Sequence, residues 1–398
     1  MLLLKKTHLE QKTSTFDDPA PTWDIFSAVI DNYGDIGVCW RLARQLVAEH
    51  GLKVRLWTDD LISFQKINPE IDSCLPIQVS RGVEIRRWVK SSMPVEPADV
   101  VIEAFACELP AVYVSAMAKS GRRHAWVNLE YLSAEAWVDS HHGLPSPHPR
   151  LPLIKYFFFP GFSPNTGGLL VEKNRLEQRA IFQADIQLCA DFWQELGIPP
   201  PEKNEIRVSL FCYGNNLATS LFTDWTKGKI PVLCLIPEGV AMTQIATFFG
   251  APRPKEGNLF KKGSLIVRVL PFLEQDKYDK LLWACNFNFV RGEDSFIRAQ
   301  WAARPMVWQA YPQEACAHRP KLRAFLERYS ADLPHSTAVA LTTFFETWNG
   351  GGTGDLDWES LWTHRATLEK HAQEWANRLI KKEDLTTNLV NFCNNKLK

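Results

Sequence analysis

Hydrophobic residues in the first part of the chain alternate between short continuous runs and a stripe with helical spacing. Apolar residues recur with a helical period along residues 38–50, which predicts a helix. Short apolar runs surround and follow it at residues 25–30, 54–57, 98–105 and 124–129. Strands that alternate with helices predict a parallel sheet covered by helices on both faces.

The alternation stops at residues 139–168, which are rich in proline, glycine and histidine and which we expect to form an irregular excursion toward a domain boundary. A second series of apolar runs and helical segments begins near residue 205. The strands expected in it are residues 206–213, 232–236, 264–269, 286–290 and 306–308. A glycine-rich break at residues 349–354 precedes a helical C-terminal region.

Two α/β domains in series therefore follow from the pattern. We expect residues 1–22 to be a flexible extension, 23–185 the first domain and 186–374 the second, with a helix at about 375–398 that can pack back on the first domain. Ligands of such sheets bind outside the carboxyl ends of the strands, in a crevice. The loops that follow strands are therefore the candidate sites.

Composition narrows the class of protein. Lys and Arg number 45 and Asp and Glu 45, so the chain has no basic excess of the kind that nucleic-acid or membrane surfaces attract. No apolar stretch reaches the ~18 residues that span a bilayer. The 9 cysteines are scattered without a C-x-x-C pair, which argues against disulfides or structural zinc and favours a reducing compartment. We expect a cytoplasmic protein.

The loop at residues 31–37 follows the first predicted strand and opens the first helix. Gly34 and Gly37 allow tight backbone geometry, and the helix start offers free N–H groups and a positive dipole end. The dipole favours the ionised form of Asp35, whereas the nearby carboxylate of Asp31 opposes it, and the balance stays open. A turn residue at Asp31 and an N-cap at Asp35 are the ordinary alternative. G-x-G-x-x-G is absent here, which disfavours a nicotinamide enzyme.

A second loop, residues 291–299, also lies between a predicted strand and a helix. Arg291 supplies a fixed positive charge, and the N–H groups near Asp294 and Ser295 could hold phosphate oxygens. Glu293 could accept hydrogen bonds from sugar hydroxyls. An ordinary capped helix with a surface arginine is the alternative.

Weaker signals lie at other strand ends. Phe211 and Tyr213 could stack on a base, although aromatic residues there are more often core. Gln275, just after Phe272, could read the edge of a nucleobase through its amide, and Glu130 could hold a cation.

Two patterns resemble metal sites but favour other interpretations. His141, His142 and His148 lie among prolines without orderly ligand spacing, which predicts a solvated loop and no metal site. Asp59 and Asp60 are typical of a turn or a helix cap.

Taken together, these loops resemble one family, the bacterial protein-arginine rhamnosyltransferases that modify translation elongation factor P (EarP). The resemblance runs from about Trp23 to the C-terminus. The matching strings are residues 30–37, 56–60, 103–107, 130–135 and 291–296, with weaker matches at 161–163, 167–169 and 311–313. The chain departs from the family in its residues before Trp23 and in Cys39, where a serine is expected.

The resemblance implies a GT-B architecture, in which two Rossmann-like domains face each other across a cleft. It implies an inverting glycosyltransferase that moves L-rhamnose from dTDP-β-L-rhamnose to the guanidinium of a loop-tip arginine of elongation factor P, which activates that factor for ribosomes stalled at polyproline. It assigns Asp35 as the catalytic carboxylate, Asp31 as its essential neighbour and Glu130 to the acceptor guanidinium. The donor site that it implies comprises Tyr33, Gly34, Phe211, Tyr213, Phe272, Gln275, Arg291, Glu293, Asp294 and Ser295. No metal or cofactor is expected.

The residue types suit this chemistry. An arginine guanidinium stays protonated, with a pKa of ~12.5 or more, so carboxylates must orient it and take its proton late or in concert with attack. The charge of Arg291 and the helix-start amides could balance the leaving diphosphate without a metal. Two alternatives stay open: a GT-B enzyme with another acceptor, such as a lipopolysaccharide core sugar, and a non-catalytic binding protein with a nucleotide-sugar fold.

Overall fold

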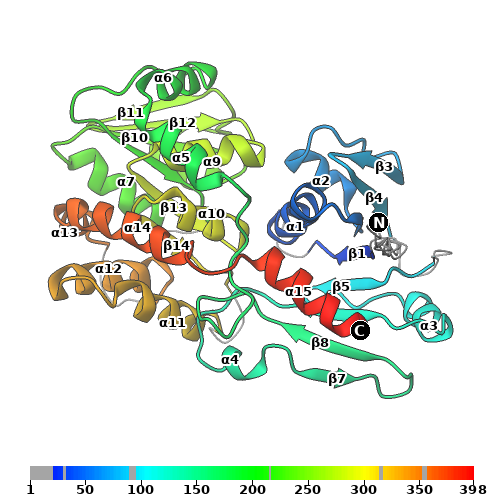
Figure 1. The fold of residues 1–398 in the computed structure, drawn as a ribbon. Coiled ribbons are helices and arrows are strands. Elements are labelled where there is room, and N and C mark those ends of the chain that lie inside the picture. The colour runs from blue at the N-terminus through cyan, green and yellow to red at the C-terminus, as the bar shows by residue number, and fades with distance from the viewer. Residues whose placement is uncertain (1–20, 30–32, 89–95, 215–216, 313–316, 352–355) are drawn as a thin grey trace, which may run out of the picture.

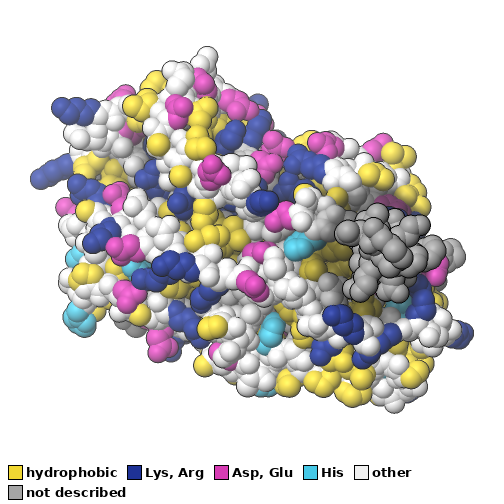
Figure 2. Space-filling view, viewed as in Figure 1, with side chains coloured by type: hydrophobic (Ala, Val, Ile, Leu, Met, Phe, Trp, Pro, Cys, Tyr) yellow, Lys and Arg dark blue, Asp and Glu magenta, His cyan; other side chains and the backbone are white. Residues whose placement is uncertain are grey.

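The computed structural model describes residues 21–29, 33–88, 96–214, 217–312, 317–351 and 356–398. It contains two sheets, each with helices on its faces (Figure 1). No helix in these ranges is both long and apolar enough to cross a membrane. Basic and acidic side chains intermix over the face shown in Figure 2, as expected from their equal numbers.

The first sheet has 8 strands in the order β3-β4-β2-β1-β5-β6-β8-β7. Its centre is parallel, and the hairpins β3–β4 and β7–β8 add an antiparallel strand at each edge. The strands are β1 (Thr22–Ser27), β2 (Lys53–Thr58), β3 (Ile77–Ser80), β4 (Val83–Arg87), β5 (Val100–Ala104), β6 (Ala125–Leu129), β7 (Pro145–Pro147) and β8 (Ile154–Phe158). The helices among them are α1 (Gly34–His50), α2 (Leu61–Ile67), α3 (Ala111–Lys119) and α4 (Val138–His141).

The second sheet has 6 strands in the order β11-β12-β10-β9-β13-β14. Its strands are β9 (Ile206–Leu210), β10 (Val232–Pro237), β11 (Leu259–Lys262), β12 (Leu265–Leu270), β13 (Phe287–Arg291) and β14 (Met306–Gln309). Its helices are α5 (Arg175–Ala184), α6 (Ile186–Glu195), α7 (Leu217–Lys227), α8 (Met242–Phe249), α9 (Gln275–Ala284), α10 (Asp294–Ala302), α11 (His318–Ser330), α12 (His335–Trp348), α13 (Trp358–Thr363) and α14 (Arg365–Leu379). The last helix, α15 (Leu385–Leu397), lies against β6 and α1 of the first sheet.

Each sheet has one place where the order of the strands reverses. In the first sheet it lies between β1 and β5, and in the second between β9 and β13. Connections from these neighbouring strands leave to opposite faces, which opens a crevice at their carboxyl ends. The loops that follow these four strands therefore define where each domain can bind a ligand.

Two crossing segments join the domains, residues 159–174 and 380–384, and they bond to each other through the ammonium of Lys382 and the carbonyl of Phe162. The N–H of Leu385, the first residue of α15, also donates to the carbonyl of Leu169 at 3.0 Å. The Thr386 hydroxyl donates to Gln45 of α1 at 2.8 Å, which fixes α15 on the first domain. One apolar core cluster runs through both sheets.

The predicted alternation of strands and helices is confirmed, with one correction. Residues 139–168 are not an irregular excursion throughout, because α4, β7 and β8 lie there and β8 extends the parallel part of the first sheet. The strands β3, β4 and β11 were not expected either. These strands are short and lie at or beside sheet edges, where side chains face solvent and the apolar pattern is weak.

Gly168 offers a test of the contact between the crossing segments. Its φ is +79°, and a Cβ there would lie 2.6 Å from the carbonyl oxygen of Glu383. Gly51 also has a positive φ, +64°, but open space around it. We expect Gly51→Ala to cost about 1 kcal/mol through its backbone conformation alone and Gly168→Ala clearly more. Urea unfolding of both variants measures this, and equal losses would contradict the contact.

Candidate active site

A cavity lies between the two domains, with about 670 Å³ of empty space when the solvent at its open side is included. The first domain contributes Tyr33 and Gly34 from the start of α1, and Ile67. Residues that follow β9, β10, β12 and β13 form the rest of its wall. All the predicted donor residues except Glu293 line this cavity: Tyr33, Gly34, Phe211, Tyr213, Phe272, Gln275, Arg291, Asp294 and Ser295.

Arg291 is fixed at the end of β13 by aromatic and backbone contacts. Its guanidinium carbon lies 4.3 Å from the ring centre of Phe211 and 4.7 Å from that of Tyr213. It also donates to the carbonyl of Cys212 at 2.7 Å. The Ser295 hydroxyl exchanges hydrogen bonds with the backbone of Arg291, which joins the strand end to the start of α10. A positive charge and a helix N-terminus thus share one part of the wall.

Aromatic residues from both domains meet at the cavity. The rings of Tyr33 and Phe272 pack edge to face with centres 4.9 Å apart. Phe272 remains 36% exposed, so its ring stands between cavity and solvent. A flat ligand that enters here meets aromatic surface contributed by both domains.

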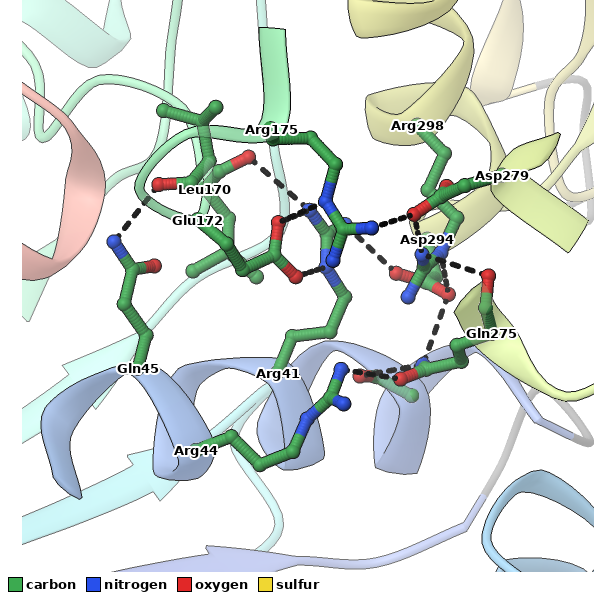
Figure 3. A network of polar contacts seen from close by, with 12 residues as sticks. Arg41, Arg44, Gln45, Leu170, Glu172, Arg175, Gln275, Asp279, Asp294 and Arg298 are labelled. Carbon is green, nitrogen blue, oxygen red and sulfur yellow. Dashed lines mark hydrogen bonds and ion pairs between the residues drawn. The ribbon is translucent and has the colours of Figure 1, made fainter. Parts of the chain in front are cut away.

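Beside the cavity, a network of charged side chains crosses the domain interface (Figure 3). Arg41 of α1 binds both carboxylate oxygens of Glu172, at 2.8 and 2.9 Å, and Asp294 of α10 at 3.0 Å. Arg298, one turn along α10, binds Asp294 at 2.8 Å and Asp279 of α9 at 2.9 Å. Asp294 therefore accepts hydrogen bonds from an arginine of each domain.

These arginines lower the pKa of two of the three acids in the network. Burial alone would raise the pKa of Glu172, but Arg41 outweighs it and holds that pKa well below its usual value. The pKa of Asp294 is likewise lowered, because Arg298 and Arg41 outweigh its burial. Asp279 differs, since burial prevails over its arginine neighbours and raises its pKa.

The amide of Gln275 belongs to the same network. It donates to the carbonyl of Gly37 at 3.1 Å and to Asp294 at 3.2 Å, and it accepts from Arg44 at 3.3 Å. A Cβ on Gly37 would lie 3.2 Å from both the Gln275 amide and the Asp294 carboxylate, so glycine permits this close approach of α1. In this structure the polar atoms of Gln275 and Asp294 bind protein groups of both domains.

Asp35 lies in the first turn of α1 and is buried, with 1% of its surface exposed. Tyr33 occupies the N-cap position, so the alternative of Asp35 as N-cap does not hold. The hydroxyl of Tyr131 donates to Asp35 at 3.2 Å. The predicted neighbour Asp31 lies outside the described residues.

Glu130 follows β6 and stands next to Tyr131. The amide of Asn128 donates to its carboxylate. Burial raises the pKa of Glu130, against the opposing effects of Asn128, Lys155 and Lys321. A partly buried acid with nearby polar groups is a reasonable site for a guanidinium.

Glu293 connects the two domains instead of lining the cavity. The backbone N–H of Leu132 and the ammonium of Lys321 both donate to its carboxylate at 2.9 Å. Burial raises its pKa more than Lys321 lowers it, and the nearby charge of Asp35 adds to the increase. The carboxylates of Asp35 and Glu293 thus lie near each other at the meeting point of the domains.

Sequence reasoning missed several residues of this region. Arg41 and Arg298 lie inside helices and Lys321 lies in α11, whereas Tyr131 belongs to the matching string 130–135 but received no role. Their importance comes from contacts with residues far away in the sequence, such as that of Arg41 with Asp294, which lies 253 positions later. The helix-cap interpretation of Asp60 is confirmed, since its side chain accepts from the N–H groups of Ile62 and Ser63.

No group of three or more His, Cys, Asp or Glu side chains in the described part of the chain is arranged to hold a metal ion. Two of the histidines at residues 141–148 make ordinary local contacts instead. His142 accepts from the N–H of Phe159 at 3.1 Å, and His148 accepts from that of Leu151 at 3.1 Å.

Comparison with known proteins gives consistent matches. Residues 23–394 match the family described as Elongation-Factor P (EF-P) rhamnosyltransferase EarP. A protein-arginine rhamnosyltransferase of Pseudomonas aeruginosa is 47% identical over 371 residues, which cover 93% of this chain and 98% of that protein.

Solved structures agree with the sequence matches. One that concerns EarP-mediated arginine glycosylation of translation elongation factor EF-P is 34% identical, has a TM-score of 0.68, and covers 94% of this chain and 99% of its own. Acinetobacter baumannii MurG, 12% identical with a TM-score of 0.50, covers 94% of this chain and 100% of its own and shares the fold alone. The neighbours are GT-B glycosyltransferases, so the predicted GT-B architecture is confirmed.

The charged network predicts how stability depends on Glu172. We expect Glu172→Gln to lower the free energy of unfolding at pH 7 by about 3 kcal/mol or more, because Arg41 loses its bidentate partner. The exposed pair of Lys370 and Glu374, 3.8 Å apart, supplies a control: Glu374→Gln should change it by about 0.5 kcal/mol at most. Similar losses in both variants would contradict a special role for the network.

Glu172→Gln should also make the free energy of unfolding depend less steeply on pH at acid pH. The pKa of folded Glu172 lies below its ordinary value of 4.5, so the stabilisation is present above about pH 4.5 and is lost as pH falls through the folded pKa. Urea titrations between neutral pH and pH 3 should therefore show a smaller loss in Glu172→Gln than in the unmodified protein.

Proposed function

Because the chain belongs to the EarP family of elongation factor P (EF-P) rhamnosyltransferases, we propose that it transfers L-rhamnose from dTDP-β-L-rhamnose to one arginine of EF-P. The observation that carries the proposal is the position of two sets of residues around one domain interface. Arg291 and Ser295 stand on the second domain, and Asp35 and Glu130 on the first. A diphosphate sugar and a guanidinium have opposite charges, and each set suits one of them.

The donor is proposed to lie in the interdomain cavity. The Arg291 guanidinium and the N–H groups at the start of α10 would bind the diphosphate and balance its charge as it leaves. The rings of Phe211 and Phe272 offer apolar faces for the thymine base. Because Arg291 supplies a permanent charge, we propose that transfer needs no metal or other cofactor.

On the acceptor side, the guanidinium would lie between Asp35 and Glu130. Two carboxylates can hold its plane and orient one nitrogen toward the anomeric carbon. The guanidinium keeps its proton until attack, so Asp35 would take that proton as the C–N bond forms and the bond to the diphosphate breaks. Attack opposite the leaving group inverts the anomeric centre, and the charge of Asp35 stabilises positive charge on the sugar.

The biological setting that we propose follows from the acceptor. Modification of a loop-tip arginine would activate EF-P for ribosomes stalled at polyproline. Because a translation factor works in the cytoplasm, we propose that this protein acts there too. EF-P is thus the proposed protein partner. Transfer to a different acceptor and binding without catalysis are the outcomes that would replace this proposal.

The direct test is transfer itself. We expect the protein with dTDP-β-L-rhamnose and unmodified EF-P to add one deoxyhexose to a single arginine, as seen by intact-mass and peptide spectrometry, and to do so in excess EDTA. Asp35→Asn should reduce the rate by at least about 1,000-fold while calorimetry still shows dTDP binding. Transfer to a sugar acceptor instead, or donor binding without any transfer, would overturn the proposal.

Substitution of Glu130 should impair use of the acceptor and leave binding of the donor unchanged. We expect Glu130→Gln to raise KM for EF-P or lower kcat by about 10-fold or more, with the Kd for dTDP unchanged, because a neutral amide cannot pair with a guanidinium. Glu177→Gln, at an exposed position of α5, is the matched control and should behave like the unmodified enzyme. Weaker dTDP binding with normal use of EF-P would move Glu130 to the donor side.

A further inference from the structure

Tyr131 joins the two halves of the acceptor site. It follows Glu130 directly, and its hydroxyl donates to Oδ1 of Asp35 at 3.2 Å. Asp35 follows β1 and Tyr131 follows β6, the neighbour of β5. The contact therefore spans the crevice where the order of strands reverses in the first sheet.

The ring of Tyr131 is held in place by stacking. It lies against Phe105 with ring centres 4.4 Å apart and planes 14° apart. Phe105 has a φ of +56°, in the left-handed region that side chains rarely adopt, and its N–H donates to the carbonyl of Leu129 at 2.7 Å. Residues retain such conformations where the surrounding structure enforces them, and such sites cluster where function needs a fixed group.

The backbone on both sides of Tyr131 is also fixed. The N–H of Glu130 donates to the carbonyl of Phe158 at 2.9 Å, and the N–H of Leu132 donates to the carboxylate of Glu293 at 2.9 Å. The ammonium of Lys321, which also binds Glu293, lies 5.4 Å from the centre of the Tyr131 ring. The phenol hydroxyl therefore has little freedom to move away from Asp35.

We propose that Tyr131 is a positioning residue that sets the plane of the Asp35 carboxylate toward an acceptor guanidinium held by Glu130. The inference rests on the proposed function and deepens it. A carboxylate rotates through a broad range about its terminal torsion, and a hydrogen bond from a clamped hydroxyl selects one orientation. Productive geometry for proton transfer and displacement tolerates only small errors, so the orientation bears on kcat.

A second tyrosine–aspartate pair in the same sheet provides the contrast. The Tyr113 hydroxyl binds Asp24, which is fully buried and also accepts from Arg55 at 2.6 Å and from Trp57 at 2.8 Å. This pair lies in the small apolar cluster around Phe26, outside the cavity wall. Its loss should reduce stability without any effect on catalysis.

The test compares Tyr131→Phe with Tyr113→Phe, each of which removes one hydroxyl and keeps the ring. We expect Tyr131→Phe to lower kcat by about 10- to 100-fold, with the melting temperature, the Kd for dTDP and the KM for the donor nearly unchanged. Tyr113→Phe should lower the melting temperature and leave kcat unchanged.

The pH profile of kcat separates positioning from packing. A base must be ionised, and loss of a donor to its ionised form disfavours that form, so the acid limb should move to higher pH in Tyr131→Phe. Glu293 and Cys39 lie near the same carboxylate, Lys321 binds Glu293, and all three are unchanged in both variants. The acid limb of Tyr113→Phe should match the unmodified enzyme.

The outcomes distinguish a failure of the proposed function from a failure of the positioning role of Tyr131. If the unmodified enzyme does not transfer rhamnose to EF-P, the proposed function fails. If it does, and Tyr131→Phe keeps the same kcat and the same acid limb, the positioning role is wrong and the proposed function stands. If Tyr131→Phe lowers kcat but also lowers the melting temperature as much as Tyr113→Phe does, and the acid limb of its pH profile does not shift, the positioning role is likewise wrong.

Discussion

The buried guanidinium of Arg41 is the interaction on which the arrangement of the two domains depends. It is 1% exposed, and it binds Glu172 of the crossing segment and Asp294 of the second domain. A buried charge is tolerable only when its partners are close and complete, so the position of each partner is tightly constrained. All three nitrogens of Arg41 are bonded, and a fully satisfied buried network rigidifies the structure around it.

Two helices, α1 and α10, carry both the residues of this interaction and the residues of the proposed active site. Arg41 and Asp35 belong to α1, and Asp294 and Ser295 to the start of α10. Each helix follows a strand at the reversal point of its own sheet. The bond between Arg41 and Asp294 therefore fixes the buried carboxylate of one domain relative to the helix start and the arginine of the other. Gly37 makes this possible, because a side chain there would press against Asp294 and Gln275.

The sequence predicted the parts of this arrangement that follow from local patterns. The central strands are apolar runs that the sequence shows clearly. Asp35, Arg291 and Ser295 lie in or beside the loops that follow such runs, so the sequence could predict their positions at the ends of strands. The edge strands were missed because partial exposure leaves no apolar run, as in β3 and β11. Arg41 and Tyr131 were missed because their roles depend on partners across the fold, and a buried arginine inside an amphipathic helix looks in sequence like an exposed one.

The residues shared between network and cavity link donor binding to domain arrangement. Gln275 and Asp294 both line the cavity, and both use their polar atoms to hold α1. A donor that accepts a hydrogen bond from the Gln275 amide must compete with the carbonyl of Gly37, and one that donates to it must compete with Arg44. Gly37 and Arg44 both belong to the other domain. A ligand shifts a conformational equilibrium by its difference in affinity between the states. A nucleotide bound in this cavity, as proposed, would therefore act on the contact between α1 and α9, and through α1 on the position of Asp35.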